Sequence, residues 1–153
     1  MPFDRFGDPK IYIAVDTGDF AAAQSLVSAL DDFCLGETPK IGFKLGLEFF
    51  MANGVAGVEK LLANRPLFLD LKFHDIPNTV AGAVRSVAHL KPNVLNVHAT
   101  GGLAMMKAAK AALDGSAAAG FSKLIAVSVL TSMDETDLEA VGQGTNVTDQ
   151  VKR

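Results

Sequence analysis

The chain has 153 residues, of which 49% are hydrophobic and 20% charged, and its formal net charge is −3. This length favours one domain with a sizeable core, the composition excludes intrinsic disorder, and the lack of a basic stretch argues against a nucleic-acid partner. The single cysteine, Cys34, excludes a disulfide framework and a multi-thiolate metal site. With no secretory signal or membrane-spanning stretch evident, we expect a cytoplasmic protein without a membrane partner.

Short apolar runs alternate along the chain with longer stretches of helical periodicity. The runs predicted to be strands are 11–16, 41–46, 67–72, 94–98 and 124–130. The stretches predicted to be helices are 19–33, 47–64 with an interruption at Asn53-Gly54, 76–90, 102–113, 134–141 and 147–153. Pro77 falls in the first turn of the third helix, where proline is tolerated.

Apolar strands separated by helices are typical of a parallel sheet covered by helices. Polar residues lie at or near the ends of four predicted strands: Asp16, Lys44, Lys72 and His98, at spacings of 28, 28 and 26 residues, and Thr131 follows 33 residues later. Units of this size fit a (β/α) barrel, whose active sites lie at the carboxyl ends of strands, although an open doubly wound sheet would show the same alternation. A closed barrel has eight strands. We therefore expect residues 1–153 to form a single domain with α/β architecture and about five βα units, which would make an incomplete barrel if the sheet is of the barrel type.

The densest polar cluster in apolar surroundings is the run Asp70-Leu71-Lys72-Phe73-His74-Asp75. On a strand, side chains 70 and 72 point to one face and side chain 71 to the other, so an acid and an amine project together, with Asp75 just past the strand end. A lysine flanked by carboxylates is held as an ammonium, which suits it to donate a proton rather than to act as a nucleophile. A structural ion pair is the alternative interpretation.

A second acid–base pair, Asp16 and Lys44, ends the first two predicted strands, and we expect adjacent strand ends to bring it close to this cluster. Such an array suits sugar hydroxyls beside a charged reacting centre, and ordinary salt bridging is the alternative. His98 has no second ligand at metal-binding spacing, so we expect a structural role for it and no metal site. Ser128 and Thr131 could hydrogen-bond a base or cap a helix.

The segment from Phe68 to Thr79, FLDLKFHDIPNT, resembles the signature of the orotidine 5′-phosphate decarboxylase family. The resemblance extends in the expected order to IAVD at 13–16, FKLG at 43–46, NVHA at 96–99 and VSVLTSM at 127–133. It implies a TIM (β/α)8 barrel that removes CO2 from orotidine 5′-monophosphate to give UMP in pyrimidine biosynthesis, without a cofactor.

The same resemblance implies roles for the two acid–base pairs. Lys72 would donate a proton to C6 as the carboxylate leaves, with Asp70 beside the departing group and Asp75 as a further catalytic residue. Asp16 and Lys44 would contact the ribose hydroxyls. Preorganised charge of this kind is usually the largest contribution to catalysis.

Four positions outside those pairs are also implied to bind substrate: Asp75, Ile76, Thr79 and Thr131. In this family Asp75 and Thr79 reach into the site of the neighbouring subunit, so the resemblance implies a homodimer with shared active sites.

The family's phosphate-gripping region, near the last strands of the barrel, has no counterpart before Arg153. We therefore expect an N-terminal portion of the enzyme, with weak or no activity alone. Two alternatives stay open. Mg²⁺-dependent sugar-phosphate decarboxylases and aldolases of the same suprafamily share an Asp-x-Lys-x-x-Asp pattern, but hold the metal partly through a glutamate where this chain has Lys44. The other alternative is a non-catalytic half-barrel that serves as an interaction module.

Overall fold

A computed structural model describes residues 9, 11–30, 41–63, 65–144 and 146–152 of the chain. Five parallel strands form one sheet in the order β1-β2-β3-β4-β5, so each strand pairs with the next along the chain. The strands are β1 Ile11–Val15, β2 Ile41–Gly46, β3 Leu67–Phe73, β4 Val94–His98 and β5 Lys123–Val127. A doubly wound sheet would reverse its strand order at a switch point. The uninterrupted order is instead that of consecutive strands in a (β/α) barrel.

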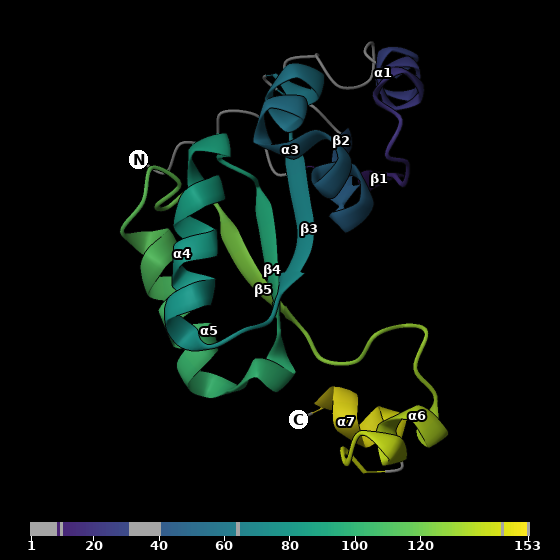
Figure 1. Ribbon diagram of the computed structural model, residues 1–153, viewed down its shortest axis with the longest axis vertical. Helices are drawn as coiled ribbons and strands as arrows, with labels where there is room; N and C mark the ends of the chain where they lie inside the picture. Colours follow the sequence, from purple (N-terminus) through teal and green to yellow (C-terminus); the bar gives the residue numbers. More distant parts are fainter. Residues whose placement is uncertain (1–8, 10, 31–40, 64, 145, 153) are drawn as a thin grey trace.

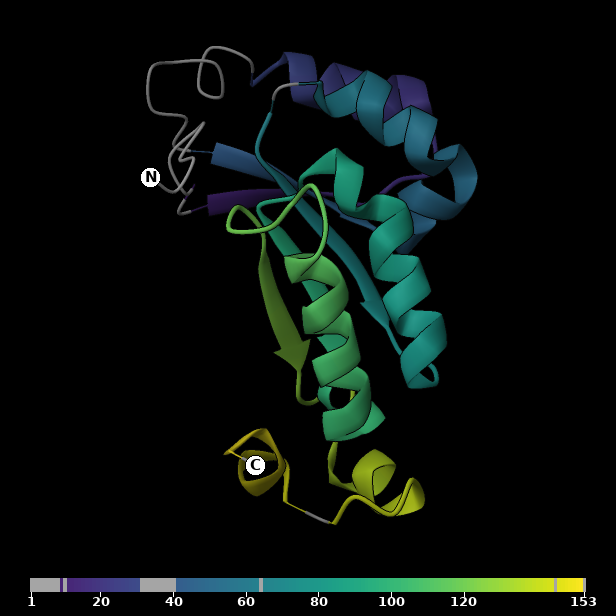
Figure 2. The ribbon, with the colours of Figure 1, turned by 90° about the vertical axis from the view of Figure 1, so that its left-hand side faces the viewer.

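Helices follow the strands in the expected alternation. They are α1 Phe20–Ser28, α3 Leu47–Leu62, α4 Pro77–Val87, α5 Gly102–Asp114, α6 Glu135–Ala140 and α7 Val147–Lys152, with 3₁₀ turns at Ala88–Leu90 and Ala99–Gly101. Helices α4 and α5 lie side by side against the sheet, and α6 and α7 lie apart from it, beyond the end of β5 (Figures 1 and 2). None of the described helices is long and apolar enough to span a membrane.

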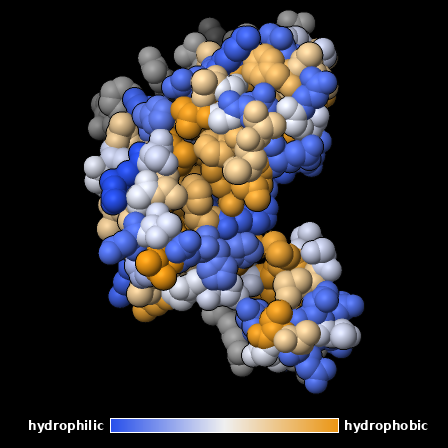
Figure 3. Space-filling model, viewed as in Figure 1, coloured by the Kyte–Doolittle hydropathy of each residue, from blue (hydrophilic) through white to orange (hydrophobic). Residues whose placement is uncertain are grey.

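The main core lies between the sheet and the helices. In β2, β3 and β4 most odd-numbered residues face the helices and are buried, among them Phe43, Leu45, Leu69 and Leu95. The other face includes Lys44, which is only partly buried, and Ile125, which pairs with Asn96 and is 44% exposed. In Figure 3, hydrophobic side chains gather over the middle of the sheet and hydrophilic ones border them. The alternation therefore separates a packed face from a face that carries the polar groups.

The five predicted strands are confirmed; β1, β3 and the start of β5 differ from the prediction by one residue, and the end of β5 differs by three. β5 ends at Val127, whereas the sequence pattern predicts strand up to residue 130. Val127 pairs with His98, the last residue of β4, so a longer β5 would have no ladder partner. Val129 and Leu130 therefore lie in an irregular segment with a bend rather than in the sheet.

The predicted interruption of the second helix is also confirmed. Gly54 has φ 62° and ψ −168°, which kinks α3, and the Asn53 side chain donates hydrogen bonds to the carbonyls of Phe49 and Gly18 at 3.1 and 3.0 Å. Only glycine adopts this backbone conformation without steric cost. The first predicted helix, 19–33, is too long, because α1 ends at Ser28 and residues 29 and 30 form a turn. Residues 31–33 and Cys34 lie outside the described residues.

Candidate active site

Four charged side chains meet at the carboxyl ends of the first three strands. We call Asp16, Lys44, Asp70 and Lys72 the charged quartet. Lys44 Nζ lies 3.1 Å from Asp16 Oδ1 and 3.4 Å from Asp70 Oδ2, and Lys72 Nζ lies 2.6 Å from Asp70 Oδ1. The expectation that neighbouring strand ends bring the two acid–base pairs together is confirmed. Charges alternate along the array, so each cation has an anionic neighbour.

Asp70 is the centre of the quartet and is 9% exposed. Burial works against its ionised form, but hydrogen bonds from Lys72 and Asn96, with the charges of Lys72 and Lys44, outweigh burial and hold the pKa of Asp70 below its ordinary value. Its Oδ1 accepts both hydrogen bonds, each at 2.6 Å. The group is therefore a carboxylate at neutral pH.

Lys44 bridges the buried and the exposed ends of the array. Burial disfavours its charged form, but the hydrogen bond to Asp16 and the charges of Asp16 and Asp70 prevail, so the pKa of Lys44 is raised. The Asp16 side chain is 67% exposed and forms the outer rim. Lys44 thus presents a permanent cation between an inner and an outer carboxylate.

Lys72 stands on an irregular stretch of β3. From Leu69 to Phe73, β3 advances four residues while the paired residues of β4 advance only two, from Leu95 to Val97. Lys72 itself has φ 50°, in the left-handed region, which costs a non-glycine residue of the order of 1–3 kcal/mol. The simple alternation expected for positions 70–72 is incomplete, because the buried Leu71 lines the same cavity as its neighbours. A bulge of this kind re-aims side chains next to functional sites.

All four members of the charged quartet line a cavity of about 420 Å³. Its other lining residues are mainly apolar, with one carboxylate and one imidazole: Val15, Gly46, Leu47, Glu48, Phe49, Leu71, His98 and Leu130. A cavity with apolar walls and a few convergent charges is the usual form of a small-molecule site. Its place at the carboxyl ends of parallel strands is that of active sites in (β/α) barrels.

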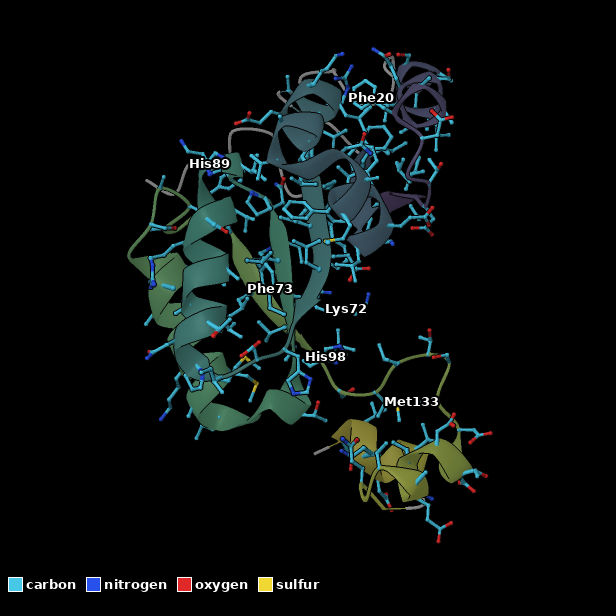
Figure 4. The ribbon with its side chains drawn as sticks, viewed as in Figure 1. Phe20, Lys72, Phe73, His89, His98 and Met133 are labelled. Carbon is cyan, nitrogen blue, oxygen red and sulfur yellow. The ribbon has the colours of Figure 1, made fainter. Side chains whose placement is uncertain are left out.

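His98, for which the sequence indicates a structural role, lines this cavity. Its ring centroid lies 5.4 Å from that of His74. Burial lowers the pKa of His98, and the charges of His74 and Lys72 lower it further against the opposing effect of Asp70. Figure 4 shows His98 and Lys72 at the same end of the sheet, with His89 at the opposite end. The ring is therefore a neutral imidazole beside the charged quartet at neutral pH.

The other predicted site residues do not line the cavity. Asp75, Ile76 and Thr79 are exposed around the start of α4, where Asp75 Oδ1 accepts a hydrogen bond from the Ile76 amide at 2.6 Å. Asp75 therefore does not flank Lys72 within the chain as the run of sequence suggested, and Asp70 is the carboxylate in contact. Thr131 is exposed in the segment after β5, where Leu130 faces the cavity instead.

Two polar residues near the site were missed by sequence reasoning. Asn96, 1% exposed, connects Asp70 with the backbone of Lys72. Its signal was an amide in the middle of an apolar strand, on the same face as His98. Glu48 accepts a hydrogen bond from the Gly18 amide at 3.1 Å and so ties down the loop after Asp16. No local pattern distinguishes Glu48 from an ordinary acidic residue in the first turn of a helix.

A larger cavity, of about 760 Å³, lies at the opposite end of the sheet, where β3 and β4 begin. Its lining includes Leu67, Asn93 and the ion pair of Glu59 with His89, whose atoms are 3.6 Å apart on side chains at least half exposed. Within the described residues, no three carboxylate, histidine or cysteine side chains form a group able to hold a metal ion.

Comparison with known proteins agrees with this geometry. Residues 9–153 match the sequence model of the orotidine 5′-phosphate decarboxylase / HUMPS family. The chain is 50% identical, over 158 residues, to the orotidine 5′-phosphate decarboxylase of Rhodospirillum rubrum, a match that covers 100% of this chain and 62% of that protein. It is 48% identical to that of Moorella thermoacetica, covering 94% of this chain and 57% of the relative.

Solved structures give the same result. Orotidine 5′-phosphate decarboxylase from Lactobacillus acidophilus superposes with a TM-score of 0.76 at 32% identity, over 94% of this chain and 64% of that one. An uncharacterized conserved protein from Geobacillus kaustophilus gives a TM-score of 0.77 at 34% identity, over 92% of this chain and 65% of that one. The chain thus spans about three-fifths of the length of its relatives, and its sheet is part of a TIM-barrel fold. From its sequence match and its fold, the chain belongs to the orotidine 5′-phosphate decarboxylase / HUMPS family.

Proposed function

We propose that the charged quartet decarboxylates orotidine 5′-monophosphate to UMP. The observation that carries the proposal is the pair formed by Lys72 and Asp70, an ammonium 2.6 Å from a buried carboxylate on the wall of the cavity. The resemblance of residues 68–79 to the family signature supports the roles of proton donor for Lys72 and of the acid beside the leaving group for Asp70. A charged cavity could bind several kinds of small molecule, and membership of the family supports orotidine 5′-monophosphate as the substrate.

The pair suits the chemistry of the reaction. Breaking the bond between C6 and the carboxylate releases CO2 and leaves the electron pair on C6. Lys72 donates its Nζ proton to that carbon and recovers a proton from solvent afterwards. The ammonium is already in place and needs no reorganisation as negative charge develops, so it stabilises the transition state more than the ground state. We therefore propose that no cofactor takes part.

Asp70 and the second pair would hold the substrate. The Asp70 carboxylate, whose lowered pKa keeps it charged, would face the substrate carboxylate and favour its departure. Lys44 and Asp16 offer donors and acceptors at the rim, which suits ribose hydroxyls. Orotidine 5′-monophosphate and UMP are both phosphorylated and do not cross membranes unaided, so we propose the cytoplasm as the site of the reaction.

A homodimer with shared sites is part of the proposal. Asp75, Ile76 and Thr79 are all exposed around the first turn of α4, and Ile76 is 67% exposed. We propose that these residues complete the cavity of a second copy. Mixing Lys72→Ala and Asp75→Asn chains tests this. In a mixed dimer, one cavity would combine the intact Lys72 of the Asp75→Asn chain with the intact Asp75 of the Lys72→Ala chain. Turnover that neither variant has alone is expected, and its absence at concentrations where the dimer forms would contradict shared sites.

The Mg²⁺-dependent alternative fits the site less well. Its metal would lie near the end of the second strand, where Lys44 Nζ sits 3.1 and 3.4 Å from two carboxylate oxygens. A cation already occupies the space between the carboxylates, so a divalent ion would have to displace it against charge repulsion. EDTA is accordingly expected to leave turnover unchanged.

The first experiment measures loss of orotidine 5′-monophosphate absorbance on addition of the chain. Lys72→Ala is expected to abolish the loss. Lys110→Ala is the matched control, because Lys110 also lies 2.6 Å from a carboxylate, that of Asp114, but on the surface of α5. Equal turnover in all three chains would contradict the role of Lys72. No turnover in any of them, at a substrate concentration that saturates relatives, would contradict the activity of this chain by itself and leave its family membership unchanged.

A further inference from the structure

Asn96 joins the two partners of the proton-donating pair. It lies in β4, is 1% exposed, and directs both of its side-chain hydrogen bonds to β3. Nδ2 donates to Asp70 Oδ1 at 2.6 Å, and Oδ1 accepts from the Lys72 backbone amide at 2.8 Å. One buried amide therefore contacts the carboxylate of one partner and the main chain of the other.

The amide can serve both contacts in only one orientation. The Lys72 N–H is a donor and needs the oxygen, and the Asp70 carboxylate is an acceptor and needs the nitrogen. An aspartate at position 96 would keep the acceptor but set a second carboxyl group against Asp70. An aliphatic residue would remove this partner from a backbone N–H, which is costly at a buried position.

The irregularity of β3 gives the second hydrogen bond its importance. Lys72 lies within the stretch where β3 and β4 lose register, and its φ of 50° differs from that of a regular strand. Residues in a bulge are left without ladder partners. The side chain of Asn96 supplies the acceptor that the regular ladder would have supplied, and so supports the backbone conformation from which the Lys72 side chain extends.

We propose that Asn96 is a positioning residue, which holds the Asp70 carboxylate and the Lys72 backbone in the relative geometry that proton delivery requires. It acts through these two residues, because Asn96 itself does not line the cavity. The proposal rests on the proposed function for its catalytic consequence. The contacts and their effect on Asp70 do not depend on that function.

Asn93, the residue just before β4, provides a matched control that also bonds to β3. It is 5% exposed, and its Oδ1 accepts a hydrogen bond from the Leu67 backbone amide at 3.0 Å, where β3 begins. Asn93→Ala and Asn96→Ala each remove a buried amide and one hydrogen bond to the backbone of β3. They differ in that only Asn96 contacts a charged side chain of the site.

The kinetic test compares both variants with the unchanged chain for turnover of orotidine 5′-monophosphate. We expect Asn96→Ala to lower kcat by about 10²-fold, the scale of a small misplacement of reacting groups, with little change in KM. The acid limb of its pH profile should move to higher pH, because the Asp70 carboxylate loses a hydrogen bond that favours its charged form. Asn93→Ala should change neither. Equal effects of the two variants, or an unmoved acid limb in Asn96→Ala, would overturn the proposal.

A second measurement works without turnover. The pKa of Asp70, followed by ¹³C NMR of its carboxyl carbon and assigned with Asp70→Asn, should rise in Asn96→Ala and stay unchanged in Asn93→Ala. Asn96→Asp should raise it further and serves if the alanine variant does not fold. If the chain without substitutions shows no turnover, only the proposed function is contradicted. If the pKa of Asp70 is the same with and without Asn96, the role of Asn96 is rejected.

Discussion

The two ends of the β3–β4 pair differ in regularity and in charge. Where the strands begin, Phe68 pairs with Val94 and Leu69 with Leu95 in a normal register, beside the larger cavity. Where they end, the register shifts, Lys72 takes a left-handed conformation, and the charged quartet meets. The same two strands thus form a regular ladder at one end and an irregular, strained segment next to the charged quartet at the other.

The difference teaches where stability and chemistry reside in this fold. The regular end buries apolar side chains and satisfies its backbone with one neutral amide, that of Asn93. The irregular end leaves three charged residues partly or largely buried, each compensated by neighbours: Lys44, Asp70 and Lys72. A strained backbone conformation costs free energy, and such conformations cluster at functional positions, where the surrounding structure holds them. Substitutions at the two ends should accordingly affect different measurements.

The largest effect on stability is expected from the regular part of the ladder. Leu95→Ala removes a side chain with 0% exposure and should lower the free energy of unfolding by about 2–5 kcal/mol, through lost burial and a residual cavity. Denaturant unfolding measures the change. Leu103→Ala, at a residue 63% exposed, is the control and should cost far less. If Leu95→Ala also altered the pH profile of turnover, stability and chemistry would not be separated between the two ends of the strand pair.

At the irregular end, Asp70→Asn should act on chemistry. It removes the carboxylate between two ammonium groups, and we expect turnover to fall by about 10²–10³-fold, as when one preorganised electrostatic group is lost. Steady-state kinetics of the folded variant measure this. Asp114→Asn, which breaks the surface pair with Lys110, should leave turnover unchanged. Comparable losses in both variants would mean that the buried pair has no special role.

A smaller effect is expected at the rim of the site. Asp16→Asn keeps the shape of the side chain but removes a charge, and KM should rise by about tenfold, the scale of one hydrogen bond to a charged group. Because the Asp16 side chain is 67% exposed, the midpoint of thermal unfolding should barely change. A fall in kcat with an unchanged KM would contradict a substrate-binding role.

The smallest effect is a dependence of stability on pH that arises from His98. Its lowered pKa means that the unfolded chain binds a proton more readily than the folded chain. Stability should therefore be fully present above the ordinary histidine value of 6.5 and decline as pH falls from there through the folded pKa. Thermal unfolding between neutral and mildly acidic pH measures the slope. His98→Gln should flatten the slope, and a slope unchanged by that substitution would reject this origin.

Much of the fold and of the site was predictable from the sequence for local reasons. Apolar runs of strand length between helical stretches determine the five βα units, and polar residues at strand ends determine which side chains share one edge of a parallel sheet. The meeting of Asp16 and Lys44 with Asp70 and Lys72 followed from that rule alone. The run from Phe68 to Thr79 indicates the family from its sequence alone.

Other features were decided only by tertiary structure. The strand order that separates a barrel from a doubly wound sheet, the end of β5 at Val127 and the shifted register around Lys72 all depend on pairing between residues more than 20 positions apart. Local propensity carries no information about such partners, since the sequence around a polar residue in a strand does not show which residue of the next strand it will contact. The role of Asn96 arises in this way, because an amide on β4 meets Asp70 and Lys72 only once the two strands are side by side.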